Sequence, residues 1–323
     1  MLSAYLPNGV GLQRRELAAG ETIPPEAIWL DLLTPTAEEE KRVEEALGID
    51  VPTREEMREI ESSNRFYDED GALYMTATIV TKLDTEIPEN SQVTFILKDG
   101  RIVTNRYVDP LPIRRYVAYA ERHAAQCANG PAVLAGLLES IINRIADIIE
   151  RVGADLDALS TEVFTRQAPR RSRGRDFRLV LERVGQGGEL ASKARESLGS
   201  LGRLLAFVQQ QPAQLSHEVR GRLRTISRDV TQMSDHATFL NNKTQFILDA
   251  TLGMINIDQN SALKIFAVMT VVLLPPTVIG AIFGMNFAHL PTAAAPWGFA
   301  AALGLMLVSS VTPYLIFRWR GWL

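Results

Sequence analysis

The residues best suited to chemistry form a short polar turn near the C-terminus. Gly284, Met285 and Asn286 stand between two uncharged hydrophobic runs, residues 265–283 and 297–317. An uncharged polar tripeptide that ends one membrane-length segment, before a short loop to another, is typical of the entrance of a cation channel. The turn therefore predicts an ion entrance at one face of a membrane.

The two hydrophobic runs predict a transmembrane hairpin. The first has 19 residues without a charge, which as a helix span about 28 Å, and the second has 21; each is long enough to cross the hydrocarbon. The alternative, two core helices of a soluble protein, is disfavoured because core helices are rarely apolar on every face. One hairpin cannot enclose a pore, so a channel built from this chain must be a homo-oligomer.

The positive charges predict how the hairpin is oriented. Lys264 precedes the first run and Arg318 and Arg320 follow the second, whereas the loop 284–296 contains no Lys or Arg. By the positive-inside rule, residues 1–264 and the tail 318–323 are cytoplasmic and the loop is external. The N-terminus shows no signal-peptide pattern, which agrees with a multi-pass inner-membrane protein.

A long helix is predicted to lead into the first span. No proline occurs between Pro212 and Pro275, so we expect one helix, with a stalk at 217–264, to continue through the membrane to residue 283. One face carries, in order, Asp249, Asn256, Asn260, Leu263, Ala267, Thr270, Leu274 and Thr277. This stripe fits a pore lining with wet and apolar rings, and it fits equally well polar contacts between packed helices. Pro275 and Pro276 predict either a simple kink or a gating element.

The rest of the chain predicts an α+β cytoplasmic domain at 1–130 and a helical hairpin at 131–216. Strands are expected at 27–33, 73–80, 92–98 and 101–107, the last two joined by the tight turn Asp99-Gly100. Helices are expected at 36–47, which begins with a Thr-x-x-Glu pattern, and at 53–61. The basic segment 167–176 is interpreted as the tip of the hairpin, and the acidic stretch 38–61 as largely a solvated helix face.

Composition excludes several classes of function. The net charge of −4 and the lack of a basic patch with interleaved aromatics argue against nucleic-acid binding. The single Cys127 and four scattered histidines provide no metal-ligand spacing. The sequence contains no P-loop, nucleophile elbow or Cys/His pair, so we expect no enzyme, no organic cofactor and no ATP-driven pump. Transport by this chain should be driven by an ion gradient.

Two stretches carry a resemblance to a known family. They are GMINIDQNSALKIFAVMTVVLLPPTVIGAIFGMNF with the terminal Trp-Leu, and, in the cytoplasmic part, AIWLDLLTPTAEEEKRVEEALGIDVPTREEMREIE with FYDEDGALYMTATIV. The chain resembles the CorA magnesium/cobalt transporter family. The resemblance implies a funnel-shaped homopentamer with an α/β/α cytoplasmic domain, which passes hydrated Mg²⁺, and also Co²⁺ and Ni²⁺, and is gated by intracellular Mg²⁺ at subunit interfaces.

The resemblance also implies roles for individual residues. Gly284, Met285 and Asn286 match the outer selectivity ring, where neutral oxygens can hold the ion through its water shell. Within the stripe, Asp249 and Asn260 match polar rings of the pore, Leu263 and Leu274 apolar constrictions, and Thr277 a wet ring. Asp229 and Asp235 on the stalk are the candidates for regulatory Mg²⁺ ligands.

The outer loop departs from the family pattern. It reads GMNFAHLPTAAAPW, with Thr292 where the family usually has an acidic residue and with no Asp or Glu at all. An acidic collar that would concentrate divalent cations is therefore missing. This departure raises the alternative of a zinc transporter similar to the sister branch ZntB. A membrane sensor of divalent cations that does not transport is a separate alternative.

Overall fold

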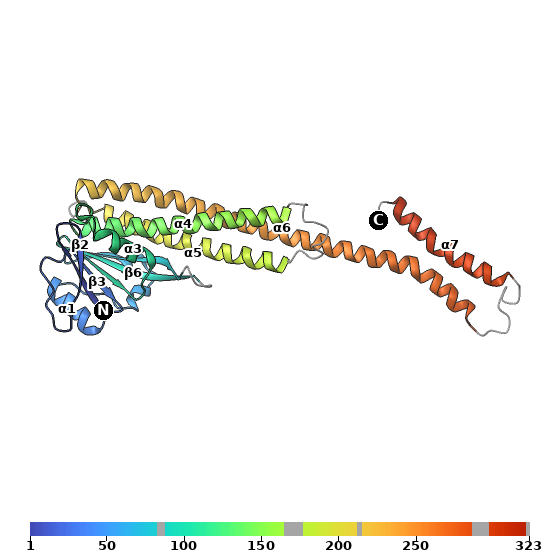
Figure 1. Cartoon of the computed structure of the whole chain (residues 1–323), viewed down its shortest axis with the longest axis horizontal. Coiled ribbons are helices and arrows are strands. Elements are labelled where there is room, and N and C mark those ends of the chain that lie inside the picture. Colours follow the sequence, from blue (N-terminus) through green and yellow to red (C-terminus); the bar gives the residue numbers. More distant parts are fainter. Residues whose placement is uncertain (83–87, 165–176, 212–214, 286–296, 321–323) are drawn as a thin grey trace. The chain divides into compact units, whose positions relative to one another are not determined.

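The computed structural model describes residues 1–82, 88–164, 177–211, 215–285 and 297–320. These residues form two compact units, Met1–Leu248 and Asp249–Leu323 (Figure 1). Asn286, Thr292 and the segment 167–176, about which the sequence makes predictions, lie outside the described residues.

The first unit is built on a mixed sheet of seven strands in the order β2-β1-β3-β7-β6-β5-β4. The strands are β1 (Leu2–Pro7), β2 (Leu12–Glu16), β3 (Trp29–Leu33), β4 (Phe66–Glu69), β5 (Ala72–Thr81), β6 (Glu89–Lys98) and β7 (Arg101–Arg106). Only the pair β3–β7 is parallel. Asp99 and Gly100 join β6 to β7 with positive φ angles of 48° and 74°, as a two-residue hairpin turn requires. The four predicted strands and this turn are confirmed.

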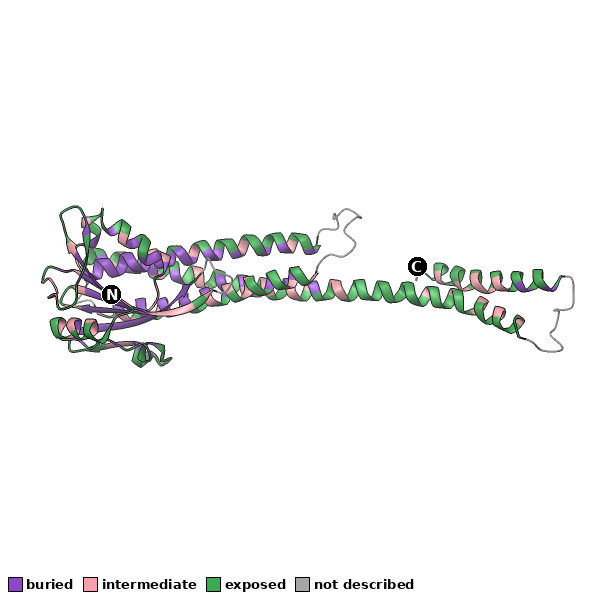
Figure 2. Ribbon diagram, turned by 60° about the horizontal axis from the view of Figure 1, so that its bottom comes forward, coloured by how far each residue is buried: buried purple, intermediate pink, exposed green. Residues whose placement is uncertain are grey.

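Helices cover both faces of the sheet, which confirms the predicted α/β/α layers (Figure 1). They are α1 (Ala37–Leu47), α2 (Ser62–Arg65), α3 (Leu111–Ala120), α4 (Gly130–Phe164), α5 (Phe177–Gln209), α6 (His217–Phe283) and α7 (Gly298–Trp319), with 3-10 turns at Glu56–Arg58 and Ala124–Cys127. Val43 of α1 packs in a buried cluster with Leu30 and Leu32. On the opposite face the Trp29 ring contacts Tyr116 of α3. Figure 2 shows the buried residues concentrated in the sheet and on the helix sides that face it.

The predicted helix at 53–61 is wrong, because only the turn Glu56–Arg58 is helical. Thr53 and Glu56 cap each other: Thr53 N–H donates to Glu56 Oε2 and Glu56 N–H donates to Thr53 Oγ1. Glu59 then leaves the helical region with φ −59° and ψ 143°. Its carbonyl accepts a hydrogen bond from Arg65 Nε, and Arg65 Nη1 donates to Thr78 Oγ1 of β5 at 3.1 Å. By contrast, the predicted Thr36 start of α1 is confirmed as a full capping box with Glu39.

A buried ion pair joins β3 to β7 beneath the helices. Arg106 donates from Nε and Nη2 to the two oxygens of Asp31 at 2.9 and 2.7 Å, and both side chains are at most 5% exposed. Thr104 donates to the same carboxylate, and Trp29 Nε1 donates to Thr104. Burial by itself would lower the pKa of Arg106, but the hydrogen bonds and charge of Asp31 raise it above its ordinary value. The buried guanidinium therefore keeps its charge, and its charge-assisted hydrogen bonds hold β3 to β7.

Three helices complete the first unit. α4 and α5 pack on the sheet and on each other. The first part of α6 packs against both, with the buried Leu240 beside Gly153 of α4 and the buried Val230 beside Gly202 of α5. Polar contacts add to this packing: Arg222 of α6 pairs with Glu139 of α4 at 2.8 Å, and Lys243 pairs with Asp157. The long amphipathic helices predicted after residue 131 are confirmed.

Candidate ion pathway

The second unit consists of the later part of α6 and of α7, and both helices are long and apolar enough to cross a membrane. The most apolar stretch of α6 is 0% buried within the chain, and that of α7 is 6% buried. Large apolar side chains such as Phe266, Leu273 and Leu307 are exposed. A helix that is apolar all round but not covered by its own chain needs lipid or other helices around it.

The long predicted helix is confirmed, because α6 runs without a break from His217 to Phe283 through Pro275 and Pro276. Its 67 residues correspond to about 100 Å of helix. Each proline lacks the N–H that would continue the backbone ladder. Next to them, the Thr277 hydroxyl donates to the carbonyls of Leu273 and Leu274 at 3.1 and 2.7 Å. These carbonyls are not the ones that lose a backbone donor: in the i→i−4 ladder, Pro275 and Pro276 leave out the bonds to Val271 and Val272.

The predicted pore-lining stripe lies on one face of α6, and its side chains are exposed. Five of its members repeat every seven residues, and the series reaches the polar turn: Asp249, Asn256, Leu263, Thr270, Thr277 and then Gly284. A strict seven-residue repeat drifts by about 20° per heptad on a straight helix, or about 100° over the whole series, so the series winds slowly across a single broad face. Asn260 and Leu274 lie four residues after Asn256 and Thr270, on the same face.

The threonines of the stripe offer acceptor oxygens. The Thr270 hydroxyl donates to the carbonyl of Phe266 at 2.8 Å, and that of Thr277 donates to the two carbonyls named above. A hydroxyl whose proton is held by the backbone presents only its lone pairs outward. Such oxygens suit the water hydrogens around a hydrated cation. Polar contacts with a second helix use the same lone pairs, so the pore lining stays a prediction.

The helix ends at the predicted ion entrance. Gly284 N–H donates to Gly280 O at 2.9 Å, and Met285 N–H donates to Ile282 O at 3.3 Å. A Cβ at position 284 would lie 3.2 Å from the Gly280 carbonyl oxygen, which is tighter than an ordinary contact. The side chain of Met285 is exposed. Glycine thus fits the turn on which the Gly-Met-Asn motif depends.

The two predicted regulatory residues lie in different surroundings. Asp229 lines a groove of 460 Å³ between α4 and α6, together with Glu150 and His236. Asp235 is exposed and is not part of this lining. Within the described ranges, no three His, Cys, Asp or Glu side chains come together to hold a metal ion. Glu150 and His236 were not predicted as site residues from the sequence. The seven-residue spacing of Asp229 and His236, which places both on one face of α6, is the signal that could have found His236.

These features define a class of protein. An α/β/α unit is followed by one continuous helix whose last part is long and apolar enough to cross a membrane, and a second such helix follows it. The sequence Gly-Met-Asn comes directly after the first of these two helices. The class is a membrane protein of the ion-transporter type.

Comparison with known proteins identifies the family. Residues 25–319 match the model of the CorA-like Mg²⁺ transporter protein family. The magnesium transport protein CorA of Yersinia pseudotuberculosis is 32% identical over 323 residues, which is 100% of both chains. The chain belongs to the CorA family.

Solved structures agree with this assignment at the level of the fold. The CorA magnesium transporter of Methanocaldococcus jannaschii matches 100% of this chain and 99% of its own, with a TM-score of 0.78 and 21% identity. The cytoplasmic domain of ZntB from Vibrio parahaemolyticus matches 80% of this chain with a TM-score of 0.61 and 12% identity. The expected CorA-like fold is confirmed, and the ZntB likeness is more distant.

Proposed function

We propose that this chain transports Mg²⁺ down its electrochemical gradient through a pore formed by several copies of α6. The observation that carries the proposal is the match over the full length to a protein named a magnesium transport protein, with the Gly-Met-Asn turn retained at the end of a membrane-length helix. Co²⁺ and Ni²⁺, which resemble Mg²⁺ in size and hydration, are proposed as further cargo.

The proposed pathway uses neutral oxygens at its entrance. Mg²⁺ releases its water reluctantly, so a ring of Asn286 amide oxygens with the carbonyls of Gly284 and Met285 would bind the ion through its water shell. Neutral acceptors release a divalent ion more easily than a ring of carboxylates does. Below the entrance, polar rings at Thr277, Thr270, Asn260, Asn256 and Asp249 alternate with apolar rings at Leu274 and Leu263. The apolar rings close the pore when they lose water.

The proposed assembly is a homopentamer in the inner membrane, with both termini in the cytoplasm. A single hairpin cannot surround a pore, and the charges of Lys264, Arg318 and Arg320 support this orientation. The uncovered apolar surface of α6 and α7 supports contacts with lipid and with neighbouring copies.

Regulation is proposed at Asp229 and Asp235 on α6. Bound Mg²⁺ would neutralise carboxylates that face one another across subunits and so keep the pore closed; without Mg²⁺, their repulsion would loosen the interface. Asp229 lies in a groove beside Glu150 and His236. This surrounding supports a regulatory role for Asp229 more directly than one for Asp235.

The acid-free outer loop favours a second candidate, zinc transport of the ZntB type. Without carboxylates, the loop 284–296 does not concentrate divalent cations, which weakens the case for a high Mg²⁺ flux. The candidate remains second because the full-length relative is named for magnesium.

The experiment that tests the proposal is Mg²⁺ uptake into proteoliposomes by the wild type and by Asn286→Ala. We expect the variant to lose about 100-fold or more in uptake, because the amide oxygen of the entrance is removed. Size-exclusion chromatography should give the same oligomer for both proteins. Uptake that is unchanged in the variant would refute the proposed entrance, and wild-type protein that binds Mg²⁺ without uptake would instead indicate a sensor.

A further inference from the structure

The two membrane-length helices of the second unit share a seam, a line of positions on each helix that are less exposed than their neighbours. On α6 the seam includes Val268, Val272, Pro276, Ile279 and Phe283, and on α7 it includes Gly298, Ala302, Met306, Ser309, Pro313 and Phe317. Both series advance by three or four residues, which keeps each of them on one face of its helix. α7 therefore packs along a single face of α6.

Gly280 and Met306 meet at this seam. A Cβ at position 280 would lie 3.3 Å from Met306 Cε, which is tighter than an ordinary contact. In a membrane, a glycine at a helix interface allows the neighbouring helix to approach closely. Methionine is unbranched and flexible, so its end can fill the space that the glycine leaves open. The methyl group of Met306 thus occupies the place where a side chain at position 280 would lie.

Gly280 also supports the turn at the predicted ion entrance. Its carbonyl accepts the N–H of Gly284 at 2.9 Å, and a Cβ at position 284 would lie 3.2 Å from the same oxygen. Gly280 therefore contacts α7 on one side and holds Gly284 through its carbonyl. A shift of Gly280 would move the backbone from which the Gly-Met-Asn motif begins.

The seam lies on the opposite side of α6 from the polar stripe. At about 100° per residue, Thr270 and Thr277 lie about 180° and 160° round the helix from Ile279. The side chains of both threonines are exposed, so α7 leaves this part of the stripe uncovered. An effect of Gly280 or Met306 on ion passage would therefore act through the turn and not through the lining.

We propose that Gly280 and Met306 are positioning residues for the ion entrance. Met306 of α7 holds Gly280 in place, and Gly280 fixes the backbone of Gly284 and Met285. This inference rests on the proposed transport of Mg²⁺, because it assigns a role at the same entrance. Neutral oxygens bind a hydrated ion through its waters only while their spacing matches the water shell. A loosened turn would therefore change the preference between ions as well as the rate.

The test is Mg²⁺ and Co²⁺ uptake into proteoliposomes by two single variants and their double. Met306→Ala empties the space beside Gly280, and Gly280→Val fills space that Met306 occupies. Each should lower Mg²⁺ uptake about tenfold and shift the ratio of Co²⁺ to Mg²⁺ uptake about threefold, with the oligomer intact by size-exclusion chromatography.

The double variant shows whether the two residues act through their contact. Gly280→Val with Met306→Ala exchanges similar volumes across the seam, and such swaps are tolerated best. We expect Mg²⁺ uptake within about threefold of the wild type, because residues in contact are not additive. A double variant in which the two losses multiply would overturn the proposal.

Hydrogen exchange gives a reading that does not depend on transport. Because the Gly284 N–H is bonded to the Gly280 carbonyl, its exchange should be about tenfold faster in both single variants and close to the wild type in the double. A wild type without Mg²⁺ uptake would refute the proposed function, while the exchange rates would still decide the contact. A wild type that transports, with single variants equal to it in uptake and exchange, would overturn this inference alone.

Matched controls lie off the seam. Leu307→Ala truncates the residue next to Met306, whose side chain is 66% exposed. Gly304→Val repeats the glycine change on α7, where a Cβ meets no atom of the described residues within 4 Å. Both should keep the uptake and the Gly284 exchange of the wild type. Losses equal to those of the seam variants would contradict the assignment to Gly280 and Met306.

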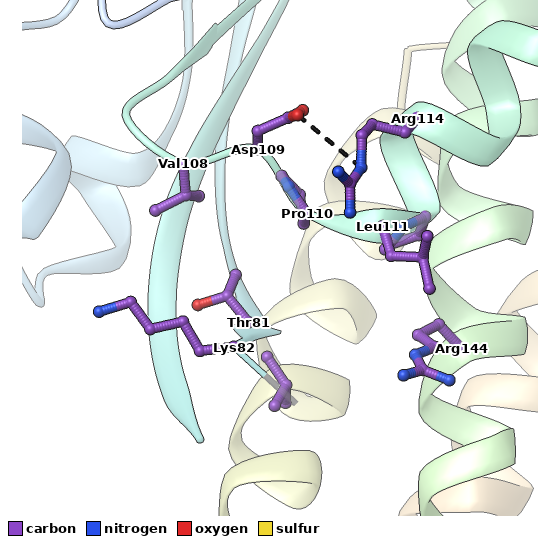
Figure 3. A pocket seen from close by; sticks show the side chains of 10 residues that line it. Thr81, Lys82, Val108, Asp109, Pro110, Leu111, Arg114 and Arg144 are labelled. Atoms are coloured by element: carbon purple, nitrogen blue, oxygen red, sulfur yellow. Dashed lines mark ion pairs between the residues drawn. The ribbon is translucent and has the colours of Figure 1, made fainter. Parts of the chain in front are cut away.

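A third control lies in the first unit. Leu111 lines a cavity of 390 Å³ at the start of α3 (Figure 3), so Leu111→Ala removes an apolar side chain from the other unit. Uptake and Gly284 exchange should stay at the wild-type values. A loss equal to that of Met306→Ala would show that apolar truncation acts through stability in general, and would overturn the proposal.

Discussion

The two compact units of this chain differ in how far their own residues bury their apolar side chains. In Met1–Leu248, apolar residues are buried between the sheet and its helices, and even a buried charge such as Arg106 has its partner, Asp31, within the same unit. In Asp249–Leu323, the apolar residues of α6 and α7 are exposed, and few side chains are covered by the chain itself. The first unit is thus specified by its own residues, whereas the apolar surface of the second is left uncovered by its own chain and needs lipid or other helices around it.

Because of this difference, we expect substitutions in the first unit to act mainly on folding stability and substitutions in the second to act mainly on transport. Changes inside the first unit should alter the free energy of unfolding and affect transport only through folding. Changes on the stripe of α6 should alter ion flux while the first unit stays folded. Each prediction below tests one side of this separation.

The largest effect is expected from Arg106→Met in the first unit. The change leaves the carboxylate of Asp31, which is 3% exposed, buried without its cation, and we expect a loss of about 3–5 kcal/mol of stability. Hydrogen exchange followed by mass spectrometry on the full chain should show faster exchange in β3 and β7, and unchanged exchange in α7.

A double variant checks the cause of that loss. Asp31→Leu with Arg106→Met removes both charges, and should recover most of the protection because replacing a buried pair by apolar side chains is often neutral or stabilising. A double variant as unstable as the single one would show that the ion pair is not the reason. Faster exchange in α7 would show that destabilising the first unit also destabilises the second.

A smaller effect is expected from Asn260→Ala on the stripe. If Asn260 lines the pore, removing its amide should lower Mg²⁺ uptake roughly tenfold, a change of about 1.4 kcal/mol, with the oligomer intact. If Asn260 instead joins packed helices, the oligomer should dissociate. Ser261→Ala is the control, because position 261 lies about 100° further round the helix and off the stripe.

The smallest effect is expected from Thr36→Ala at the start of α1. The capping box with Glu39 would be lost, at a cost of about 1 kcal/mol. Hydrogen exchange should increase in α1 alone, and Mg²⁺ uptake should not change. Thr36→Ser should retain the protection, since it keeps the hydroxyl. A change in Mg²⁺ uptake by the Thr36→Ala protein would contradict the expectation that local changes in the first unit leave transport unaltered.

Local patterns predicted much of the fold and of the pathway from the sequence. The capping box at Thr36, the turn at Asp99-Gly100 and the long run without proline before Pro275 each depend on residues close in sequence. The failed helix at 53–61 shows the limit. Arg65, which binds the Glu59 carbonyl, is held in place by a buried hydrogen bond to Thr78 of β5, and the local sequence does not show that contact. The edge strand β2, with its polar residues, and α3, which begins beside two prolines, carried too weak a pattern to be predicted.

The stripe of α6 was predictable because a helix brings residues at seven-residue spacing to one face. The surroundings of the stripe were not predictable, because its side chains are exposed on the described part of the chain and no local pattern says what covers them.

The most direct test of the central claim is a side-by-side measurement of Mg²⁺, Co²⁺ and Zn²⁺ uptake by the wild-type protein in proteoliposomes, without ATP. We expect Mg²⁺ and Co²⁺ uptake that follows the imposed gradient and exceeds Zn²⁺ uptake. Strong Zn²⁺ uptake with negligible Mg²⁺ uptake would contradict the account and establish the zinc transporter in its place.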